Sequence, residues 1–405
     1  MQVPIPVLRE DNIPITHRGS NQSGMRAYNE RLVLTLVRRH GSLAKTDIAR
    51  MTGLSAQTVS VIMRQLEADE LLLRGEPMRG RVGQPSVPLS LNPEGAFFLG
   101  LKIGRRSCEL VLLDFLGKIV ARVSRSYSYP LPQDTVDFTR KAIVQVLAAI
   151  PGREYRVAGL GIATPFELWN WADEIGVEGD QMEAWRDFDV HARISAISEF
   201  PVYVQNDATA ACAAELVFGE NNRLQDFMYV YVGTLVGGGI VLNGSLYSGR
   251  TGNAGALGPM PVPGRGGRSV QLLEHASLVV LERAVQERGL DPVMIWEGHD
   301  DWSEIEAEVS EWIKLSARSL AHAVVASASV IDFEAVLVDG GFPAAIRKRL
   351  VKAIEAEIGS LDVQGIAVPA LKEGSIGTVA RALGAASLPL FDKYLIDQNT
   401  LMRDG

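Results

Sequence analysis

The 405-residue sequence predicts an α/β protein in two parts, a small helical module at the N-terminus and a larger domain of alternating strands and helices. Three observations predict it. Helical apolar patterns fill residues 25–68, whereas strands and helices alternate from residue 96 onward. Residues 1–90 hold 12 Lys and Arg against 8 Asp and Glu, and the remainder holds 28 against 40. The length suits two or three domains, each with its own core.

Composition excludes several classes of protein. Hydrophobic residues make up 47% and charged residues 22%, which is typical of an ordinary globular protein. Cys108 and Cys212 are too few for a disulfide framework or a multi-cysteine zinc site. No apolar run approaches the ~20 residues of a membrane helix, and the N-terminal segment carries prolines and acids where a signal peptide is apolar. We therefore expect a cytoplasmic protein with no membrane partner.

Residues 25–53 predict two helices. The first, MRAYNERLVLTLVRRHG, ends at Gly41. Its apolar stripe consists of Leu32, Val33, Leu36 and Val37. The second, AKTDIARMTGL, is short, ends at Gly53, and is expected to turn Ile48 and Met51 inward.

A third helix follows at SAQTVSVIMRQLEADELL, with Ser55 as its N-cap. Its apolar stripe consists of Val59, Ile62, Met63 and Leu66. Its opposite face carries Gln57, Ser60 and Arg64. A short helix, a glycine turn and a second helix with a small polar outer face form a helix-turn-helix, whose second helix can enter the DNA major groove.

The segment LLLRGEPMRGRVGQPSVPLSLN predicts a β-hairpin with a basic tip, which is typical of a wing. Arg79 and Arg81 at the tip are expected on phosphates or in a minor groove. The candidate DNA-binding residues are Lys45, Ser55, Gln57, Thr58, Ser60, Arg64, Arg79, Arg81 and Gln84. The expected partner is a double-stranded DNA operator, and the alternative is a three-helix protein-interaction module with a solvated polar face.

The larger domain contains a faint internal repeat. FFLGLKIGRRSCELVLLDFLGKIVARV and FMYVYVGTLVGGGIVLNGSLYSG each consist of a strand, a glycine turn, a second strand and a second turn. Two such copies suggest two similar lobes that face a cleft. The second copy has the glycines of a phosphate cradle. The candidates for nucleotide or phosphate contact are Gly233, Thr234 and Gly237, with Gly340 and Gly341 after the apolar strand AVLVDGG.

Between the copies, PVYVQNDATAACAAELVFG places Asn206 and Asp207 at the start of an alanine-rich helix. In a cleft this pair can hydrogen-bond a polyol, and Asp207 can take a hydroxyl proton. The alternative is that Asp207 only caps the helix.

The helix-turn-helix followed by QNDATAA, GTLVGGGIV, GNAGALGPM and VDGG resembles the ROK family of repressors and sugar kinases, from about residue 25 to 390 and in the same order. The resemblance implies a two-lobed hexokinase/actin-like (ribonuclease H-like) domain with a sugar-type ligand, in a homodimer or homotetramer on DNA. The expected domains are an N-terminal arm at 1–24, a winged helix-turn-helix at 25–92 and a ROK effector and oligomerisation domain at 93–405.

Departures from the family pattern bear on the choice between its two functions. Kinase members open the domain with an aspartate and a Gly-Gly-Thr turn, which serve metal and phosphates. The matching residues here are Lys102, Gly104, Arg105 and Arg106. Because phosphoryl transfer depends on metal-assisted positioning of phosphates, we expect no kinase activity. The alternatives are a sugar kinase with a fused DNA-binding domain, in which Asp207 is catalytic, and a DNA-binding protein that needs no effector.

The family's zinc motif, Glu-x-Gly-His followed by a cysteine cluster, is also altered. Ala256 and Pro259 stand at its Glu and His positions, and Arg268 and Gln271 in the cysteine region, so no zinc or other cofactor is expected. Glu274 stands where the family has a carboxylate after that cluster, and it either reaches a ligand hydroxyl or anchors the loop. His275 is expected to be a surface or packing residue.

The tryptophan-rich stretch ATPFELWNWADEIG lies where family members line the sugar pocket, and Trp185 follows it. Aromatic faces stack on sugar rings; the alternative is a tryptophan-rich lobe core or dimer surface. The candidate effector-binding residues are Glu167, Asn206, Asp207 and Glu274. We therefore expect a repressor of carbohydrate-related genes, whose effector is a sugar or a sugar derivative such as a sugar phosphate.

Overall fold

The computed structural model describes residues 21–77, 87–166, 168–169, 182–221, 223–296 and 301–396. The chain divides into two compact units. Within the described ranges, the first holds the residues up to Leu91 together with 248–254 and 394–396, and the second holds 92–247 and 255–393. Four candidate residues lie outside the described residues, namely Arg79, Arg81 and Gln84 of the wing tip and Glu167. Trp171 of the tryptophan-rich stretch ATPFELWNWADEIG lies outside them as well.

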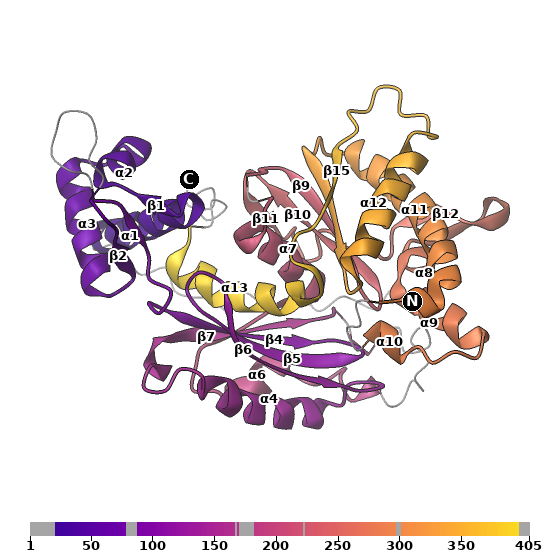
Figure 1. The fold of residues 1–405 in the computed structure, drawn as a ribbon, viewed down its shortest axis with the longest axis horizontal. Coiled ribbons are helices and arrows are strands. Elements are labelled where there is room, and N and C mark those ends of the chain that lie inside the picture. The colour runs from indigo at the N-terminus through magenta and orange to yellow at the C-terminus, as the bar shows by residue number, and fades with distance from the viewer. Residues whose placement is uncertain are drawn as a thin grey trace. The chain divides into compact units, whose positions relative to one another are not determined.

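The first unit packs helices against a small sheet (Figure 1). Its elements are α1 (Asn21–His40), β1 (Ser42–Leu43), α2 (Lys45–Thr52), α3 (Ala56–Ala68), β2 (Leu72–Arg74) and β3 (Leu89–Leu91). β3 pairs antiparallel with β2, which confirms the predicted hairpin, and also with β1, which the sequence did not indicate. Gly53 ends α2 at φ 71°, a left-handed conformation that glycine adopts without strain. Ser55 Oγ then accepts from Thr58 N at 3.1 Å and caps α3.

The core of this unit differs from the predicted one in two places. The stripe of α3 is buried as predicted. On α1 the fully buried residues are Val33, Leu34 and Val37, so Leu34 joins the stripe, and Leu32 and Leu36 are half-buried. The prediction that Met51 points inward is wrong, because its side chain is 43% exposed. The short α2 buries only Ile48, and Met51 lies in its last turn, beside the bend at Gly53.

The second unit contains two sheets with equivalent strand orders, β6-β5-β4-β7-β8 and β11-β10-β9-β14-β15. The first sheet and its helices are β4 (Phe97–Ile103), β5 (Ser107–Leu113), β6 (Ile119–Ser126), α4 (Pro132–Leu147), β7 (Val157–Thr164), α6 (Val190–Ser195) and β8 (Val202–Asn206). In each sheet the strand that comes first in the chain, β4 or β9, pairs antiparallel with the next strand, β5 or β10. It also pairs parallel with a later strand, β7 or β14. The strand–turn–strand repeat predicted from the sequence is therefore confirmed as a duplication of the whole sheet.

The second sheet is joined to the first through α7 (Asp207–Phe218), which follows directly on β8. Its strands are β9 (Phe227–Val232), β10 (Val236–Leu242), β11 (Ser245–Tyr247), β14 (Ala335–Gly340) and β15 (Ala370–Glu373). A separate pair is formed by β12 (Pro261–Pro263) and β13 (Ser269–Gln271). The remaining helices are α8 (Leu273–Ala276), α9 (Leu278–Glu287), α10 (Val293–Trp296), α11 (Glu306–Ala328), α12 (Ala344–Ile358) and α13 (Ala380–Tyr394). The largest core cluster lies here, with Trp312 of α11 and Val336 of β14 both buried.

The last helix, α13, packs closely on the first sheet and on α7. A Cβ at Gly161 of β7 would lie 1.7 Å from the Ala385 carbonyl oxygen, and one at Gly384 would lie 1.7 Å from that of Ala210. Glycine is required at both places because the backbones themselves are in contact. Figure 1 shows α4 and α6 on the opposite face of the first sheet from α13. Among the described residues, no helix combines the length and apolarity needed to cross a membrane.

Candidate DNA-binding surface and candidate effector site

The solvent face of α3 carries unengaged polar side chains. Gln57 and Arg64 are exposed and Ser60 is half-buried. Within the described part of the chain, no hydrogen bond or ion pair engages these three side chains or that of Lys45, the first residue of α2. Their donors and acceptors are therefore available to another molecule. Two other candidates have a local role: Ser55 Oγ and Thr58 Oγ1 lie 2.8 Å apart and form the cap of α3.

Acidic charge on α3 is neutralised locally. Glu67 accepts two hydrogen bonds from Arg74 of β2, at 2.7 and 2.8 Å. The hydrogen bond from Arg74 lowers the pKa of the Glu67 carboxyl below its ordinary value. The carboxylate is therefore bound to β2, and the exposed face of α3 from Gln57 to Arg64 presents neutral side chains and one cation.

In the second unit, Asp207 is paired with an arginine. Asp207 is the first residue of α7, and its Oδ2 accepts from Arg381 Nη1 at 3.2 Å. The guanidinium also lies 5.1 Å from the centre of the Tyr231 ring, which places it over an aromatic face. Burial raises the pKa of Tyr231 to about 12, so its hydroxyl stays protonated at neutral pH. The carboxylate that was expected to bind a ligand hydroxyl is thus already bound by the protein.

Asn206 and Glu274 also have partners within the protein. Asn206 Oδ1 accepts from Ala208 N at 3.1 Å and Thr209 N at 3.2 Å, so the asparagine, and not the aspartate, caps α7. The other end of the amide, Nδ2, donates no hydrogen bond to another described residue. Glu274 Oε1 accepts from Gln271 N at 2.8 Å, which is the loop-anchoring contact given as its alternative role.

The cationic side chains of Lys102, near the end of β4, and Arg106, in the turn that follows, are bound by other groups of the protein. Lys102 is 6% exposed and its Nζ donates to Ser107 Oγ at 2.5 Å. Burial, with the charge of Arg381, lowers the pKa of Lys102 to about 8. Arg106 donates to both carboxylate oxygens of Glu282 on α9, at 2.9 and 3.1 Å. This turn therefore connects β4 and β5 to α9 by an ion pair.

Close packing accounts for glycines that were candidates for a phosphate cradle. A Cβ at Gly237, in β10, would lie 2.9 Å from Ala208 Cβ of α7. A Cβ at Gly340 would lie 2.4 Å from the Val232 oxygen, whereas one at Gly341 would make an ordinary contact with Leu278 Cδ1 at 3.6 Å. The carbonyl groups of Gly233 and Thr234 accept from Leu278 N at 3.0 Å and Val279 N at 3.2 Å. This loop is thus bonded to the start of α9.

The tryptophans divide between two environments. Trp185 is 3% exposed, its Nε1 donates to the Pro130 oxygen at 2.9 Å, and its ring meets Phe188 edge-on. It is a core residue, as the alternative interpretation proposed. Trp169 is half-buried with the Arg186 guanidinium 5.9 Å from its ring. His275 Nδ1 lies 2.8 Å from Ser319 Oγ, in agreement with a packing role.

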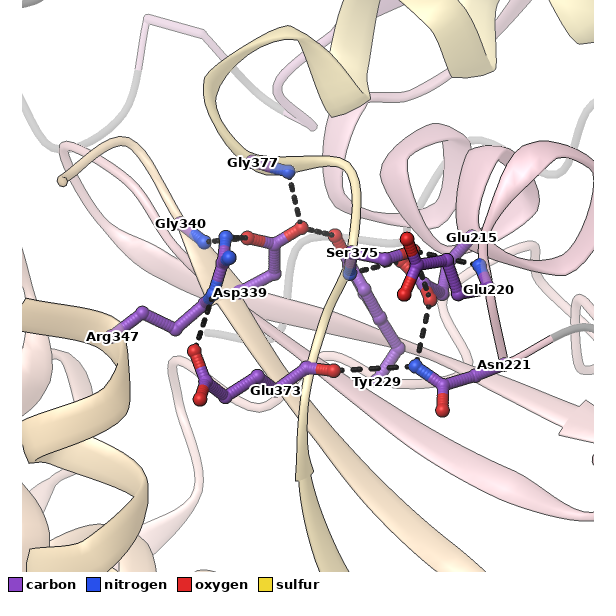
Figure 2. A network of polar contacts seen from close by, with 10 residues as sticks. All are labelled: Glu215, Glu220, Asn221, Tyr229, Asp339, Gly340, Arg347, Glu373, Ser375 and Gly377. Atoms are coloured by element: carbon purple, nitrogen blue, oxygen red, sulfur yellow. Dashed lines mark hydrogen bonds and ion pairs between the residues drawn. The ribbon is translucent and has the colours of Figure 1, made fainter. Parts of the chain in front are cut away.

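Figure 2 shows a buried polar network at the start of α13. Asp339, at the end of β14, is fully buried and accepts from Tyr229 Oη, Gly340 N, Gly377 N and Arg347 Nη1 at 2.8–3.1 Å. Glu215 of α7, also fully buried, accepts from Ser375 N and Ser375 Oγ at 2.9 Å. These two carboxylates fix the segment 375–377, which leads directly into Arg381.

Sequence reasoning missed Arg381, Asp339 and Glu282, although two of them carry a signal. Arg381 is the only charged residue in the first eleven of α13, ARALGAASLPL, and a lone charge in an apolar helix needs a partner. Asp339 ends a strand that is otherwise apolar, AVLVDG. Glu282 lies 176 residues from Arg106, so no local pattern indicates it. Val61 was also missed, and its exposure of 51% is visible only in the structure.

Comparison with known proteins places both units. The model of the ROK family matches residues 98–390, and that of a winged helix-turn-helix DNA-binding family matches residues 26–72. The protein y4fQ of Sinorhizobium fredii is 28% identical over 90% of this chain and 91% of its own length. The xylose repressor of Bacillus subtilis is 25% identical over 60% of this chain and 62% of its own length.

Among solved structures, a ROK family transcriptional regulator, described as a homolog of the E. coli MLC protein, superposes with a TM-score of 0.65. It is 20% identical and covers 94% of this chain and 100% of its own. A ROK family glucokinase shares the fold of the second unit as well. The predicted fold class, a winged helix-turn-helix followed by a sugar-kinase-like α/β domain, is confirmed. This chain therefore belongs to the ROK family.

Proposed function

We propose that this protein is a transcriptional repressor of carbohydrate-related genes, and that its ROK domain senses a sugar or a sugar derivative. Membership of the family, the winged helix-turn-helix unit and the relatives that are named repressors support this proposal. The observation that most directly supports an effector site is the ion pair of Asp207 with Arg381, beside Lys102. The arginine occupies the carboxylate, and a ligand with hydroxyl groups can compete for it.

The effector would bind by replacing Arg381 at Asp207. Two hydroxyl groups of a sugar can donate to the carboxylate, and Asn206 Nδ2 supplies a donor next to it. Release of Arg381 would act on the start of α13, because this residue is the second of that helix. The chain continues from α13 into residues 394–396, which belong to the first unit, where Ile396 N donates to Thr35 Oγ1 of α1 at 3.2 Å. We infer that effector binding acts through α13 on the first unit, which contains α3, the helix proposed to contact the bases.

A sugar kinase is the second candidate, favoured by Asp207 at the start of α7 and by the related glucokinase fold. Lys102 opposes it. A buried ammonium group stands where kinases of the family have the carboxylate that serves metal, and it would repel the metal ion that positions phosphates. We infer that the chain does not transfer phosphate. Incubation with ATP, magnesium and a panel of hexoses decides this, because turnover that Asp207→Asn abolishes would contradict the inference.

No zinc ion or other cofactor is part of the proposed function. The residues at the family's ligand positions, Ala256 and Pro259 among them, offer no donor for zinc. The protein is proposed to act in the cytoplasm as a homodimer or homotetramer. Two reading helices would then contact operator half-sites about 34 Å apart, and the effector would change that spacing.

The function is tested by a thermal-shift screen against sugars, sugar phosphates and polyols, followed by operator binding with each compound that stabilises the protein. A ligand present at a hundred times its Kd adds about 2.7 kcal/mol of stability. The expected compound stabilises wild type, stabilises Asp207→Asn much less, and changes operator affinity. If no compound shifts the transition while operator binding is intact, the protein is a DNA-binding protein without a sugar effector.

A further inference from the structure

The exposed face of α3 carries one large apolar side chain in its centre. Val61 is 51% exposed, whereas the other large apolar residues of the helix are buried. It follows Gln57 by four residues and precedes Arg64 by three, so all three side chains lie on one face. A single exposed apolar side chain is common on protein surfaces, but this one lies between two polar side chains on the second helix of a helix-turn-helix, the element that faces the bases in such domains.

We propose that Val61 recognises the 5-methyl group of a thymine in the major groove of the operator, between base contacts of Gln57 and Arg64. Thymine is the base that presents a methyl group in that groove, and apolar side chains contact it. The inference rests on the proposed DNA-binding function and adds to it the base that this side chain reads.

The spacing of the three residues matches that of base pairs. A helix rises 1.5 Å per residue, so Gln57 and Arg64 are about 10 Å apart along α3. Bases follow one another every ~3.4 Å along a DNA strand, so this length faces about three base steps. Glutamine pairs with adenine and arginine with guanine by two hydrogen bonds each. The expected half-site therefore contains a thymine within three steps of an adenine and a guanine.

The surroundings of Val61 favour DNA over an apolar protein partner. Arg64 and Lys45 form no ion pair among the described residues, and Glu67, the acidic residue of α3 whose carboxylate their charges influence, is bound by Arg74. The face is therefore cationic and complementary to a polyanion. A surface hollow of about 540 Å³ lies between α3 and α1, with Val61 on one side and Met25 on the other, and it leaves Val61 open to an approaching base edge.

The experiment uses the full-length protein and duplex sites that it selects from a random library. The selected site is resynthesised with each thymine in turn replaced by deoxyuridine, which removes only the 5-methyl group. Wild type is expected to lose affinity about fourfold at one thymine of each half-site, the value of burying one methyl-sized group. Val61→Ser, which replaces both methyl groups by a hydroxyl group at an exposed position, is expected to bind both duplexes equally. Val330→Ala, at a residue of the second unit that is 81% exposed, is the control and keeps the wild-type ratio.

Three results would overturn the inference. Wild type that binds every deoxyuridine duplex as tightly as the parent site reads no thymine methyl group. A Val61→Ser variant that loses the same fourfold at the same position shows that another residue makes the contact. A Val61→Ser variant that binds every duplex as wild type does but changes its sedimentation coefficient assigns the face to a protein partner. Selection that enriches no sequence would instead disprove DNA binding itself, and the inference with it.

Discussion

Arg381 Nη1 lies 3.2 Å from Asp207 Oδ2, which ties the second residue of α13 to the first residue of α7. The two side chains are 13% and 15% exposed, so water screens their attraction only weakly. The pair links the helix that leads to the first unit with the carboxylate that we assign to the effector. Its energetics therefore bear on both stability and signalling.

Removal of one partner of this pair is expected to be costly. Arg381→Met should lower the free energy of unfolding by about 3–5 kcal/mol, because it leaves a shielded carboxylate without its counter-charge. Asp207→Asn combined with Arg381→Met should cost less than the sum of the two single changes. Urea unfolding of the four proteins measures this. Arg140→Met is the matched control, since its pair with Asp137 is about half exposed and should contribute at most about 1 kcal/mol. Additive single effects would show that the pair is not coupled.

Stability should depend on pH through Lys102. Burial lowers its pKa in the folded protein to about 8 from the ordinary 10.5. Between these values the unfolded chain binds the proton more strongly, so stability rises with pH. Between pH 7.5 and pH 9.5, the free energy of unfolding of wild type should rise by about 2 kcal/mol more than that of Lys102→Met. Paired urea titrations at the two pH values measure the difference, and an unchanged difference would contradict a lowered pKa.

Asp339→Asn is expected to disrupt the segment that precedes α13. The carboxylate accepts from four donors, and an amide in its place sets an NH₂ group against some of them. A loss of about 3–5 kcal/mol of unfolding free energy is expected for a fully buried ionic group. Glu373→Gln alters the other carboxylate bound to Arg347, which is 37% exposed, and should change stability little. Equal losses in the two variants would show that the ion pairs of Arg347, and not the other hydrogen bonds of Asp339, stabilise this segment.

Arg64 and Lys45 should differ in their effects on DNA binding. Arg64→Ala is expected to cost about 1–3 kcal/mol and to relax the preference for one base, while folding and effector binding stay intact. Lys45→Ala should weaken binding to all sequences alike and reduce the salt dependence by about one unit of slope. Fluorescence anisotropy over a salt series distinguishes these outcomes. Arg318→Ala, an exposed arginine of α11, is the control. Normal operator binding by Arg64→Ala would show that the exposed face of α3 does not contact the bases.

Most of the fold was predictable because its signals are local. The stripe of α3, the glycine turn at Gly53 and the repeat of strand, turn and strand each depend on residues close in sequence. The winged hairpin was found from its alternating residues, although its tip lies outside the described residues. The orientation of Met51 was predicted wrongly, because in a two-turn helix the tertiary contacts, and not the periodicity, decide which side is covered.

The candidate sites were predictable only in part. Gln57 and Arg64 were found because polar residues on one face of a patterned helix are visible in the sequence. Asn206 and Asp207 were found as a pair, but which of them caps α7 depends on side-chain geometry. The partners of Asp207 and Arg106 lie 174 and 176 residues away. A pattern within one segment cannot indicate such a partner.

The sequence by itself determined the two-part organisation, the helix-turn-helix with its wing, and the repeated strand–turn–strand pattern of the two sheets. Only the tertiary structure decided that Arg381 pairs with Asp207, that Arg106 pairs with Glu282, and that Val61 is exposed on the same face of α3 as Gln57 and Arg64. The physical reason is that helices, turns and strands arise from interactions between near neighbours, whereas the charge state, burial and availability of a side chain depend on groups that the fold brings together from distant parts of the chain.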